Sequence, residues 1–349
     1  MTAPPTDPPP PSRRRRRAGP GAALAVSIAV ALVTAGCTSD GGQELAADTA
    51  PGDTTASTAS TLPATTEPTA PVVPPGGFDV VTHTETLVDT TRATPDQPDT
   101  GVPPSDERVL ETTFTYPDAP GPFPLIVFAH GHNGHPRKFT ELFEAWAAAG
   151  FVVAAPAFPL SNDEVPGRAS VFDLPQQPGD VSFVISEALG ASGEPGNPLQ
   201  GRINPEEIGV GGLSLGGATT YEVAFDECCR DDRIDAVAVF DALRPDLAGL
   251  HLDVGLPLLV IHADQDPAIP VATAEEAFAA ASPPKYLIVL HEVMHASAYE
   301  NDPDPADELV RDATTAFWRR YVAHDAEAAA TFSQVAAVDG LSTVTEQPG

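Results

Sequence analysis

The apolar positions of the chain follow two patterns that alternate along the sequence. Continuous apolar runs, typical of strands buried on both faces, occupy residues 125–129, 151–155, 207–210, 234–240, 257–261 and 285–290. Apolar residues at helical spacing occupy residues 139–147, 180–189, 218–225, 272–281 and 306–321. Residues 80–89 and 108–116 alternate between apolar and polar side chains, which predicts an initial antiparallel pair. Together these patterns predict an α/β fold with a doubly wound, mostly parallel sheet and helices on both faces.

A glycine-rich segment lies where one predicted strand ends and a predicted helix begins. It reads Gly212-Leu213-Ser214-Leu215-Gly216 and fits the pattern G-x-S-x-G, which holds a nucleophilic serine on a tight turn. Such a turn strains the serine backbone, and a Cβ at either glycine would collide with neighbouring elements. The segment therefore predicts Ser214 as a nucleophile. The alternative is an ordinary serine in a glycine-rich turn.

A serine hydroxyl attacks carbon only if a base removes its proton, and the base needs an acid beside it. Asp264 and Asp266 follow a predicted buried strand, and His295 lies in the loop after the last predicted strand. The chain order Ser214, Asp266, His295 is the order of α/β-hydrolase triads. Asp264 is expected to cap a turn. His291 is the alternative base, but it lies at a strand end and is expected to turn into or beside the sheet.

Three further stretches resemble parts of known hydrolases. The stretch from His262 to Pro270 is similar to the acid loop of cutinases, and His295 with Ala296 resembles their histidine loop. Residues 125–131 resemble the strand that ends in their oxyanion loop. Residues 78–321 thus resemble the α/β-hydrolases that include cutinases, platelet-activating-factor acetylhydrolase and dienelactone-hydrolase-like esterases. The resemblance implies an α/β-hydrolase fold.

The same resemblance implies roles for individual residues. The second Asp of the cutinase acid loop is catalytic, which implies Asp266 as the triad acid, and the backbone N–H groups of His132 and Leu215 form the oxyanion hole. The platelet-activating-factor type of acetylhydrolase takes its acid from the end of an earlier strand, so Asp241 is the alternative acid. Polyester hydrolases carry Trp near that point, where this chain has Asp241-Ala242-Leu243, and this difference argues against polyester activity.

The N-terminal part of the chain has the pattern of an export signal followed by a linker. Five arginines at residues 13–17 precede an apolar run and Cys37, which predicts a lipoprotein-type signal peptide with Cys37 as the lipidation site. A Thr/Ala/Pro-rich stretch follows, and such a stretch cannot bury enough apolar surface to fold. The prediction is a signal peptide, a disordered tether, a catalytic domain and a disordered C-terminal tail, at residues 1–36, 37–77, 78–325 and 326–349.

This organisation predicts an extracytoplasmic lipoprotein, held by its N-terminal lipid on the outer face of the plasma membrane. The alternatives are a plain cleaved signal, which would give a secreted protein, and an uncleaved membrane anchor.

Charge and cysteine content narrow the set of partners. The chain has 18 Lys and Arg against 49 Asp and Glu, a formal net charge of −31. Phosphate binding needs clustered basic residues, so nucleic acid is not an expected partner. The adjacent Cys228 and Cys229 are expected as buried thiols, with a vicinal disulfide as the alternative. The histidines at positions 130, 132 and 135 could be metal ligands, but a zinc-binding loop needs a fixed geometry and usually a carboxylate or a further histidine, so neither a metal nor another cofactor is expected.

These features together predict an exported serine carboxylic-ester hydrolase that works through an acyl-enzyme. No long insertion separates Asp241 from Pro257, so no large lid is expected, which favours short to medium acyl chains. The expected substrate is a small-molecule or lipid ester, and the enzyme is expected to be a monomer. The alternatives are an acyltransferase or a peptidase on the same fold, or a non-catalytic binding module of the cell envelope.

Overall fold

The computed structural model describes residues 71–243, 249–301 and 303–349. The predicted signal peptide, Cys37 and residues 37–70 of the predicted tether lie outside this described part. Within the described ranges, no helix combines the length and the apolar character that a membrane span requires.

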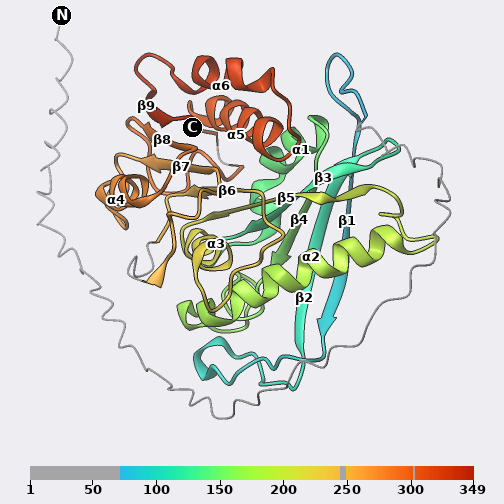
Figure 1. The fold of residues 1–349 in the computed structure, drawn as a ribbon. Helices are drawn as coiled ribbons and strands as arrows, with labels where there is room; N and C mark the ends of the chain where they lie inside the picture. The colour runs from blue at the N-terminus through green and yellow to red at the C-terminus, as the bar shows by residue number, and fades with distance from the viewer. Residues whose placement is uncertain (1–70, 244–248, 302) are drawn as a thin grey trace, which may run out of the picture. The chain divides into compact units, whose positions relative to one another are not determined.

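The described strands form one nine-stranded sheet in the order β1-β2-β4-β3-β5-β6-β7-β8-β9 (Figure 1). Their bounds are β1 Val80–Asp89, β2 Arg108–Pro117, β3 Phe123–Ala129, β4 Val152–Ala157, β5 Ile203–Leu213, β6 Ala236–Phe240, β7 Leu258–Ala263, β8 Lys285–Leu290 and β9 Ser342–Gln347. Neighbouring strands from β4 through β8 are parallel. The pairs β1–β2, β2–β4 and β8–β9 are antiparallel. The prediction of a mostly parallel sheet that opens with antiparallel strands is confirmed.

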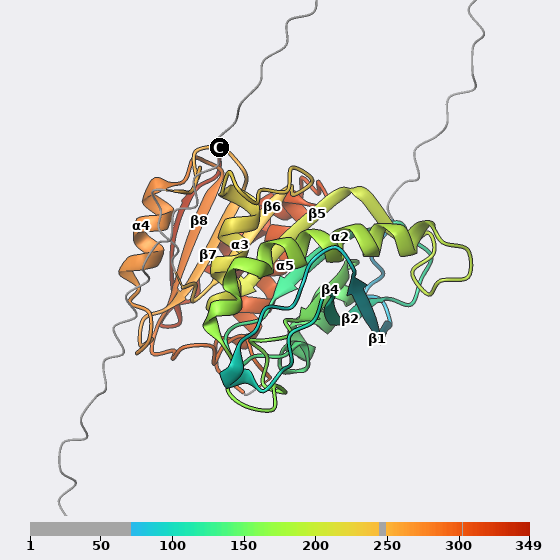
Figure 2. The same ribbon diagram turned by 90° about the horizontal axis from the view of Figure 1, so that it is seen from below.

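Helices cover both faces of this sheet, as the apolar patterns predict. Their bounds are α1 Thr140–Ala148, α2 Gln177–Gly193, α3 Leu215–Phe225, α4 Ala272–Ala280, α5 Asp307–Tyr321 and α6 Ala328–Ala336. Side chains of α2, α3 and α4 join one buried apolar cluster, and those of α1, α5 and α6 join the other. Successive residues of one strand enter different clusters, since Val127 belongs to the first and Phe128 to the second. Figures 1 and 2 show α2 and α3 together on one side of the strands.

The C-terminal region corrects one prediction, because residues 326–349 are not a disordered tail. They contain α6 and β9, and β9 pairs with β8 along its whole length, from Ser342 opposite Leu290 to Gln347 opposite Lys285. The α6 residue Phe332 is buried, with its ring centroid 4.5 Å from that of Tyr286. This order comes from backbone pairing and packing against distant residues. The sequence of the segment alone does not reveal these contacts.

The boundary between tether and domain also lies earlier than predicted. The Gly77 N–H donates to the Pro74 oxygen at 2.9 Å, which closes a turn inside residues assigned to the tether. The Phe78 N–H donates to the Ala148 oxygen at 2.8 Å. A Cβ on Gly150 would lie 3.5 Å from Val73 Cγ2, so Val73 packs close to the end of α1. The folded part therefore begins before residue 78.

A buried ion cluster ties β2 to α2 and to the segment that precedes it. The Arg108 side chain is fully buried and donates to Asp180 at 2.6 Å and to Asp173 at 2.9 Å. Asp173 also accepts the Leu160 N–H at 3.3 Å, so the cluster holds the loop that follows β4. That loop lies against the segment after β3, because the Asn133 N–H donates to the Ser161 oxygen at 2.7 Å. The cluster thus stabilises the loop after β4, which in turn contacts the segment after β3.

Candidate active site

Ser214 occupies the sharp turn between β5 and α3 that the sequence predicts. Its φ of 57° and ψ of −113° lie outside the regions that serine prefers, which is the strain expected at such a turn. Backbone hydrogen bonds hold it, because its N–H donates to the Phe240 oxygen at 2.9 Å and its carbonyl accepts the Leu243 N–H at 2.9 Å. A Cβ at Gly212 or Gly216 would collide with backbone atoms, so only glycine fits at these two positions.

Asp266 and His295 meet at the same edge of the sheet as Ser214. Asp266 follows β7 and His295 follows β8, and the carboxyl ends of these parallel strands share one edge with β5. His295 Nδ1 lies 2.6 Å from Asp266 Oδ2. The other Asp266 oxygen accepts the N–H groups of Ala268 at 2.7 Å and Ile269 at 2.9 Å, which fixes the carboxylate. The geometry is that of a base oriented by an acid.

The pKa shifts of this pair follow from its contacts. Burial opposes ionisation of Asp266, but the hydrogen bonds from His295, Ile269 and Ala268 outweigh it, so the pKa of Asp266 is lowered. Burial likewise disfavours the charged form of His295. The hydrogen bond to Asp266 and the nearby charge of Asp241 outweigh that effect and raise the pKa of His295. The pair is therefore arranged to stabilise an imidazolium.

Asp241, the alternative acid, lies beside the same imidazole but does not hydrogen-bond to it. Its closest oxygen is 3.8 Å from His295 Nδ1. The buried carboxylate instead accepts the Ala263 N–H at 2.8 Å, the Ala296 N–H at 3.0 Å and the Tyr299 hydroxyl at 3.3 Å. Burial, the largest influence, raises the pKa of Asp241. The structure thus brings Asp266 into contact with His295, while Asp241 holds the loop that carries it.

His291, the alternative base, takes part in a separate pair. His291 Nδ1 lies 3.1 Å from Asp264 Oδ2, and His291 Nε2 lies 2.8 Å from Thr343 Oγ1. Asp264 also accepts the Glu292 N–H at 2.8 Å, so its carboxylate contacts the loop after β8 and not a turn of its own segment. Both ring nitrogens of His291 therefore have partners other than Ser214 or Asp266.

The link between Ser214 and His295 stays a prediction. Among the residues that the structure describes, no side chain or backbone group hydrogen-bonds to the Ser214 hydroxyl, and Ser214 is only partly exposed. Hydrogen bonds between a nucleophile and its base are often long until substrate binds, so this finding does not remove His295 as the base.

The two predicted oxyanion donors flank the serine. Leu215 is the first residue of α3, and the first N–H groups of a helix have no acceptor within it. The segment that carries His132 is close to the nucleophile, because a Cβ on Gly131 would lie 3.1 Å from Ser214 Cβ. The His132 side chain points to the next loop, with Nε2 2.9 Å from the Ala169 oxygen. This placement is compatible with an oxyanion hole built from the two backbone N–H groups.

Two buried residues near the acid were missed by the sequence reasoning. His262, at the end of β7, has Nε2 3.7 Å from Asp266 Oδ2 and 2.9 Å from the Ile269 oxygen. Tyr299 lies beyond the histidine loop and donates to Asp241. His262 stands at the carboxyl end of a predicted strand, a position that points to the site. Tyr299 has no comparable signal, because only the folded loop turns its ring inward.

Few groups of the described residues could hold a metal ion. Asp241, Asp266 and His295 place ligand atoms within 4.8 Å of one another, as do Asp226, Cys228 and Cys229. In the first group His295 Nδ1 is already engaged with Asp266. The histidines at positions 130, 132 and 135 have other hydrogen-bond partners, namely Gly131 and Phe158, Ala169, and Arg137.

The opposite end of α3 carries the adjacent cysteines, and it corrects a third expectation. Cys228 and Cys229 form a disulfide, and Cys228 is exposed, so they are not buried thiols. The reason is that both follow the end of α3 in a surface turn, where apolar burial is not available.

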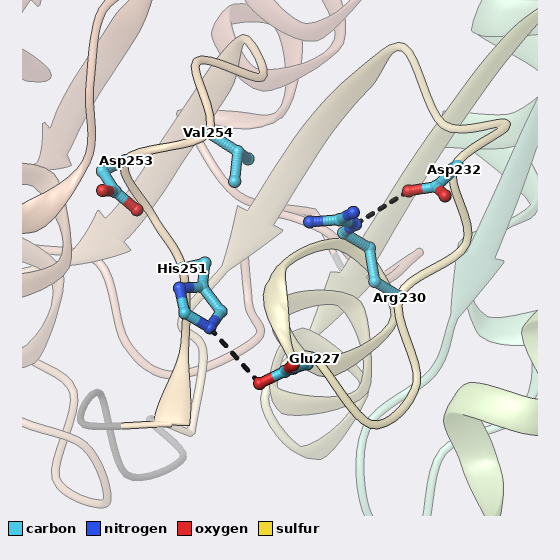
Figure 3. A pocket seen from close by; sticks show the side chains of 6 residues that line it. All are labelled: Glu227, Arg230, Asp232, His251, Asp253 and Val254. Carbon is cyan, nitrogen blue, oxygen red and sulfur yellow. Dashed lines mark hydrogen bonds and ion pairs between the residues drawn. The ribbon is translucent and has the colours of Figure 1, made fainter. Parts of the chain in front are cut away.

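A cavity of about 560 Å³ lies next to this turn, lined by Glu227, Arg230, Asp232, His251, Asp253 and Val254 (Figure 3). Within its walls Arg230 pairs with Asp232 at 2.8 Å, and His251 Nε2 lies 4.0 Å from Glu227 Oε2. It is separate from the site around Ser214, which lies at the other end of the helix.

The fold and the turn at Ser214 are those of the α/β-hydrolases. Residues 110–327 match the family model described as "Dienelactone hydrolase family", and the chain belongs to this family. None of the curated proteins matches the chain. The family lies within the α/β-hydrolase superfamily, so the resemblance stated from the sequence is confirmed at this level.

Proposed function

We propose that the protein is an exported serine carboxylesterase that hydrolyses esters of short to medium acyl chains through an acyl-enzyme. The observation that carries the proposal is the Asp266–His295 pair, joined at 2.6 Å, at the sheet edge where Ser214 stands on a strained turn. Membership of the family supports hydrolase activity in general. The serine mechanism and the substrate class are our inference from the site.

In the proposed mechanism His295 accepts the Ser214 proton while Ser214 Oγ bonds to the ester carbonyl carbon. Asp266 stabilises the imidazolium that forms, and the backbone N–H groups of His132 and Leu215 stabilise the oxyanion. The imidazolium then protonates the leaving alcohol, which departs and leaves an acyl-enzyme. Water, deprotonated by His295, attacks the acyl carbon and regenerates Ser214.

The acyl-chain range rests on the connections around the site. Residues 241–257 alone separate β6 from β7, which leaves little chain for a large lid over Ser214. An open site favours small or flexible esters over substrates that require lid opening at an interface.

Labelling with a fluorophosphonate probe tests the mechanism. We expect the wild-type chain to be labelled and a Ser214→Ala variant to remain unlabelled, because the probe bonds to the activated serine. Hydrolysis of p-nitrophenyl esters from acetate to decanoate measures the chain-length preference, with the shorter esters expected to react faster. Equal labelling of both proteins would refute the serine mechanism.

The proposed location rests on the N-terminal sequence, with Cys37 as the lipidated residue. Metabolic labelling with a fatty acid tests it. Incorporation is expected in the full-length chain and absent from a Cys37→Ser variant, and a secreted wild-type chain without lipid would refute the anchor but leave the esterase proposal intact.

A further inference from the structure

The Gly131–His132 peptide is held from its carbonyl side by two donors. The Gly134 N–H donates to the Gly131 oxygen at 2.9 Å. His130 Nδ1 lies 2.7 Å from the same oxygen. The carbonyl of Gly131 and the N–H of His132 belong to one planar trans peptide, in which these two bonds point in opposite directions. Fixing the carbonyl therefore fixes the direction of the His132 N–H.

The surroundings of His130 determine which ring nitrogen carries its proton. The side chain is 1% exposed, and burial lowers the pKa of His130 to about 4, so the ring is neutral. The Phe158 N–H donates to Nε2 at 3.0 Å, so Nε2 is the acceptor. A neutral imidazole has one N–H, which must then be on Nδ1 and donates to Gly131. The single proton of His130 is thus committed to the Gly131 carbonyl.

The rest of the segment holds the same arrangement in place. Asn133 has a φ of 58°, and its N–H donates to the Ser161 oxygen at 2.7 Å. A Cβ on Gly134 would lie 2.8 Å from the Gly131 oxygen and 3.0 Å from His130 Nδ1. Any larger residue at position 134 would therefore press on both partners of the His130 hydrogen bond.

We infer that His130 is a positioning residue of the oxyanion hole, which aims the His132 N–H at the substrate oxyanion by holding the opposite end of the same peptide. The inference rests on the proposed esterase function, because it assigns the His132 N–H its role there. His130 does not touch the substrate. It acts through the Gly131–His132 peptide. That peptide packs against Ser214, because a Cβ on Gly131 would lie 3.1 Å from Ser214 Cβ.

Steady-state kinetics and inhibitor binding on His130→Phe and His130→Asn variants test the inference. Phe keeps the ring beside Phe158, whose centroid is 4.9 Å away, but cannot donate. Asn can place an amide N–H near the position of Nδ1. We expect His130→Phe to lower kcat for p-nitrophenyl butyrate about 10- to 100-fold with little change in KM, since one oxyanion donor contributes about 10²- to 10³-fold. His130→Asn should recover part of that loss.

Inhibitor binding separates this role from general damage to the fold. An arylboronic acid forms a tetrahedral adduct on an activated serine and places an oxygen in the oxyanion hole. Its affinity should fall in His130→Phe by about the factor lost in kcat. The matched control is His135→Phe, because His135 is another buried histidine of the same segment whose Nδ1 accepts the Arg137 N–H instead. It should keep kcat and boronate affinity close to the wild-type values, because the His135 hydrogen bond goes to the Arg137 N–H and not to the Gly131 carbonyl.

A Gly134→Ala variant disturbs the second donor to the Gly131 carbonyl, because its Cβ would lie 2.8 Å from that oxygen. It covers the case in which His130→Phe does not fold. It should also lower kcat and boronate affinity together. If wild-type esterase activity is present and both variants retain wild-type kcat and boronate affinity, the inference is overturned while the proposed function stands. If the wild-type protein shows no esterase activity at all, the proposed function fails first.

Discussion

The loop after β8 and the segment after β3 each place a histidine with its Nδ1 atom against an oxygen, yet the two side chains have opposite electrostatic surroundings. His295 Nδ1 meets the Asp266 carboxylate at 2.6 Å, with Asp241 at 3.8 Å, and the pKa of His295 is raised. His130 Nδ1 meets a backbone carbonyl in a buried site, and the pKa of His130 is lowered to about 4.

The difference shows how one residue type can serve two tasks a few strands apart. A carboxylate partner stabilises the charged form and so prepares a histidine to accept a proton. A carbonyl partner in a desolvated site keeps the ring neutral, so that its one N–H becomes a fixed hydrogen-bond donor. Proton transfer at His295 and peptide positioning at His130 are the corresponding functions under our proposals.

The largest expected effect on activity comes from substituting the two acids beside His295, Asp266 and Asp241. Asp266→Asn should lower kcat/KM about 10³-fold, because it removes the charge bonded to His295 and the orientation of the ring. Asp241→Asn should lower it only about 10-fold, since Asp241 acts on His295 without a direct hydrogen bond. Rates on p-nitrophenyl butyrate, with thermal melting as a control for folding, measure both. The reverse ranking would show that Asp241 is the triad acid.

The pH dependence of kcat/KM tests the raised pKa of His295. Its neutral form is the base, so activity should rise with pH through a midpoint above the ordinary histidine value of 6.5 and be lost below it. Asp241→Asn should move this midpoint to lower pH, because a neighbouring negative charge that favours the imidazolium is gone. A wild-type midpoint at or below 6.5 would contradict the assignment. His130 titrates at about pH 4, well below this range.

The smallest effect is expected at His291, a third histidine with an acidic partner. His291 is bonded to Asp264 and to Thr343. His291→Asn should therefore change kcat/KM by no more than about twofold, as is usual for a surface substitution outside the site. Measurement of kcat/KM on p-nitrophenyl butyrate tests this prediction. A decrease in kcat/KM above 100-fold would make His291 the base in place of His295.

Much of the molecule follows from local sequence signals. The apolar periods predict the strands from β3 to β8 and the helices between them, because a two-faced buried strand and an amphipathic helix each impose their own spacing. The turn at Ser214 is local as well. The spacing G-x-S-x-G can be recognised without a fold, although the contact that excludes a side chain at Gly216 comes from Ala129 in β3, far away in the chain.

Other features depend on residues that lie far apart in the chain. Both Asp241 and Asp266 follow strands whose carboxyl ends lie at one edge, so strand order alone could not choose between them. The choice came from loop geometry, which sets one carboxylate at 2.6 Å and the other at 3.8 Å from the same nitrogen. The ordered C-terminal strand has the same kind of origin, because its hydrogen bonds go to β8.

The sequence by itself determined the α/β class, the serine on its turn, and the acids and histidines available beside it. The tertiary structure decided which acid meets His295, that the last residues complete the sheet, and that His130 bonds to the Gly131 carbonyl. Backbone spacing is a local property that each stretch of chain carries with it. Hydrogen-bond partners and burial are properties of distant segments brought together, and they exist only once the chain has folded.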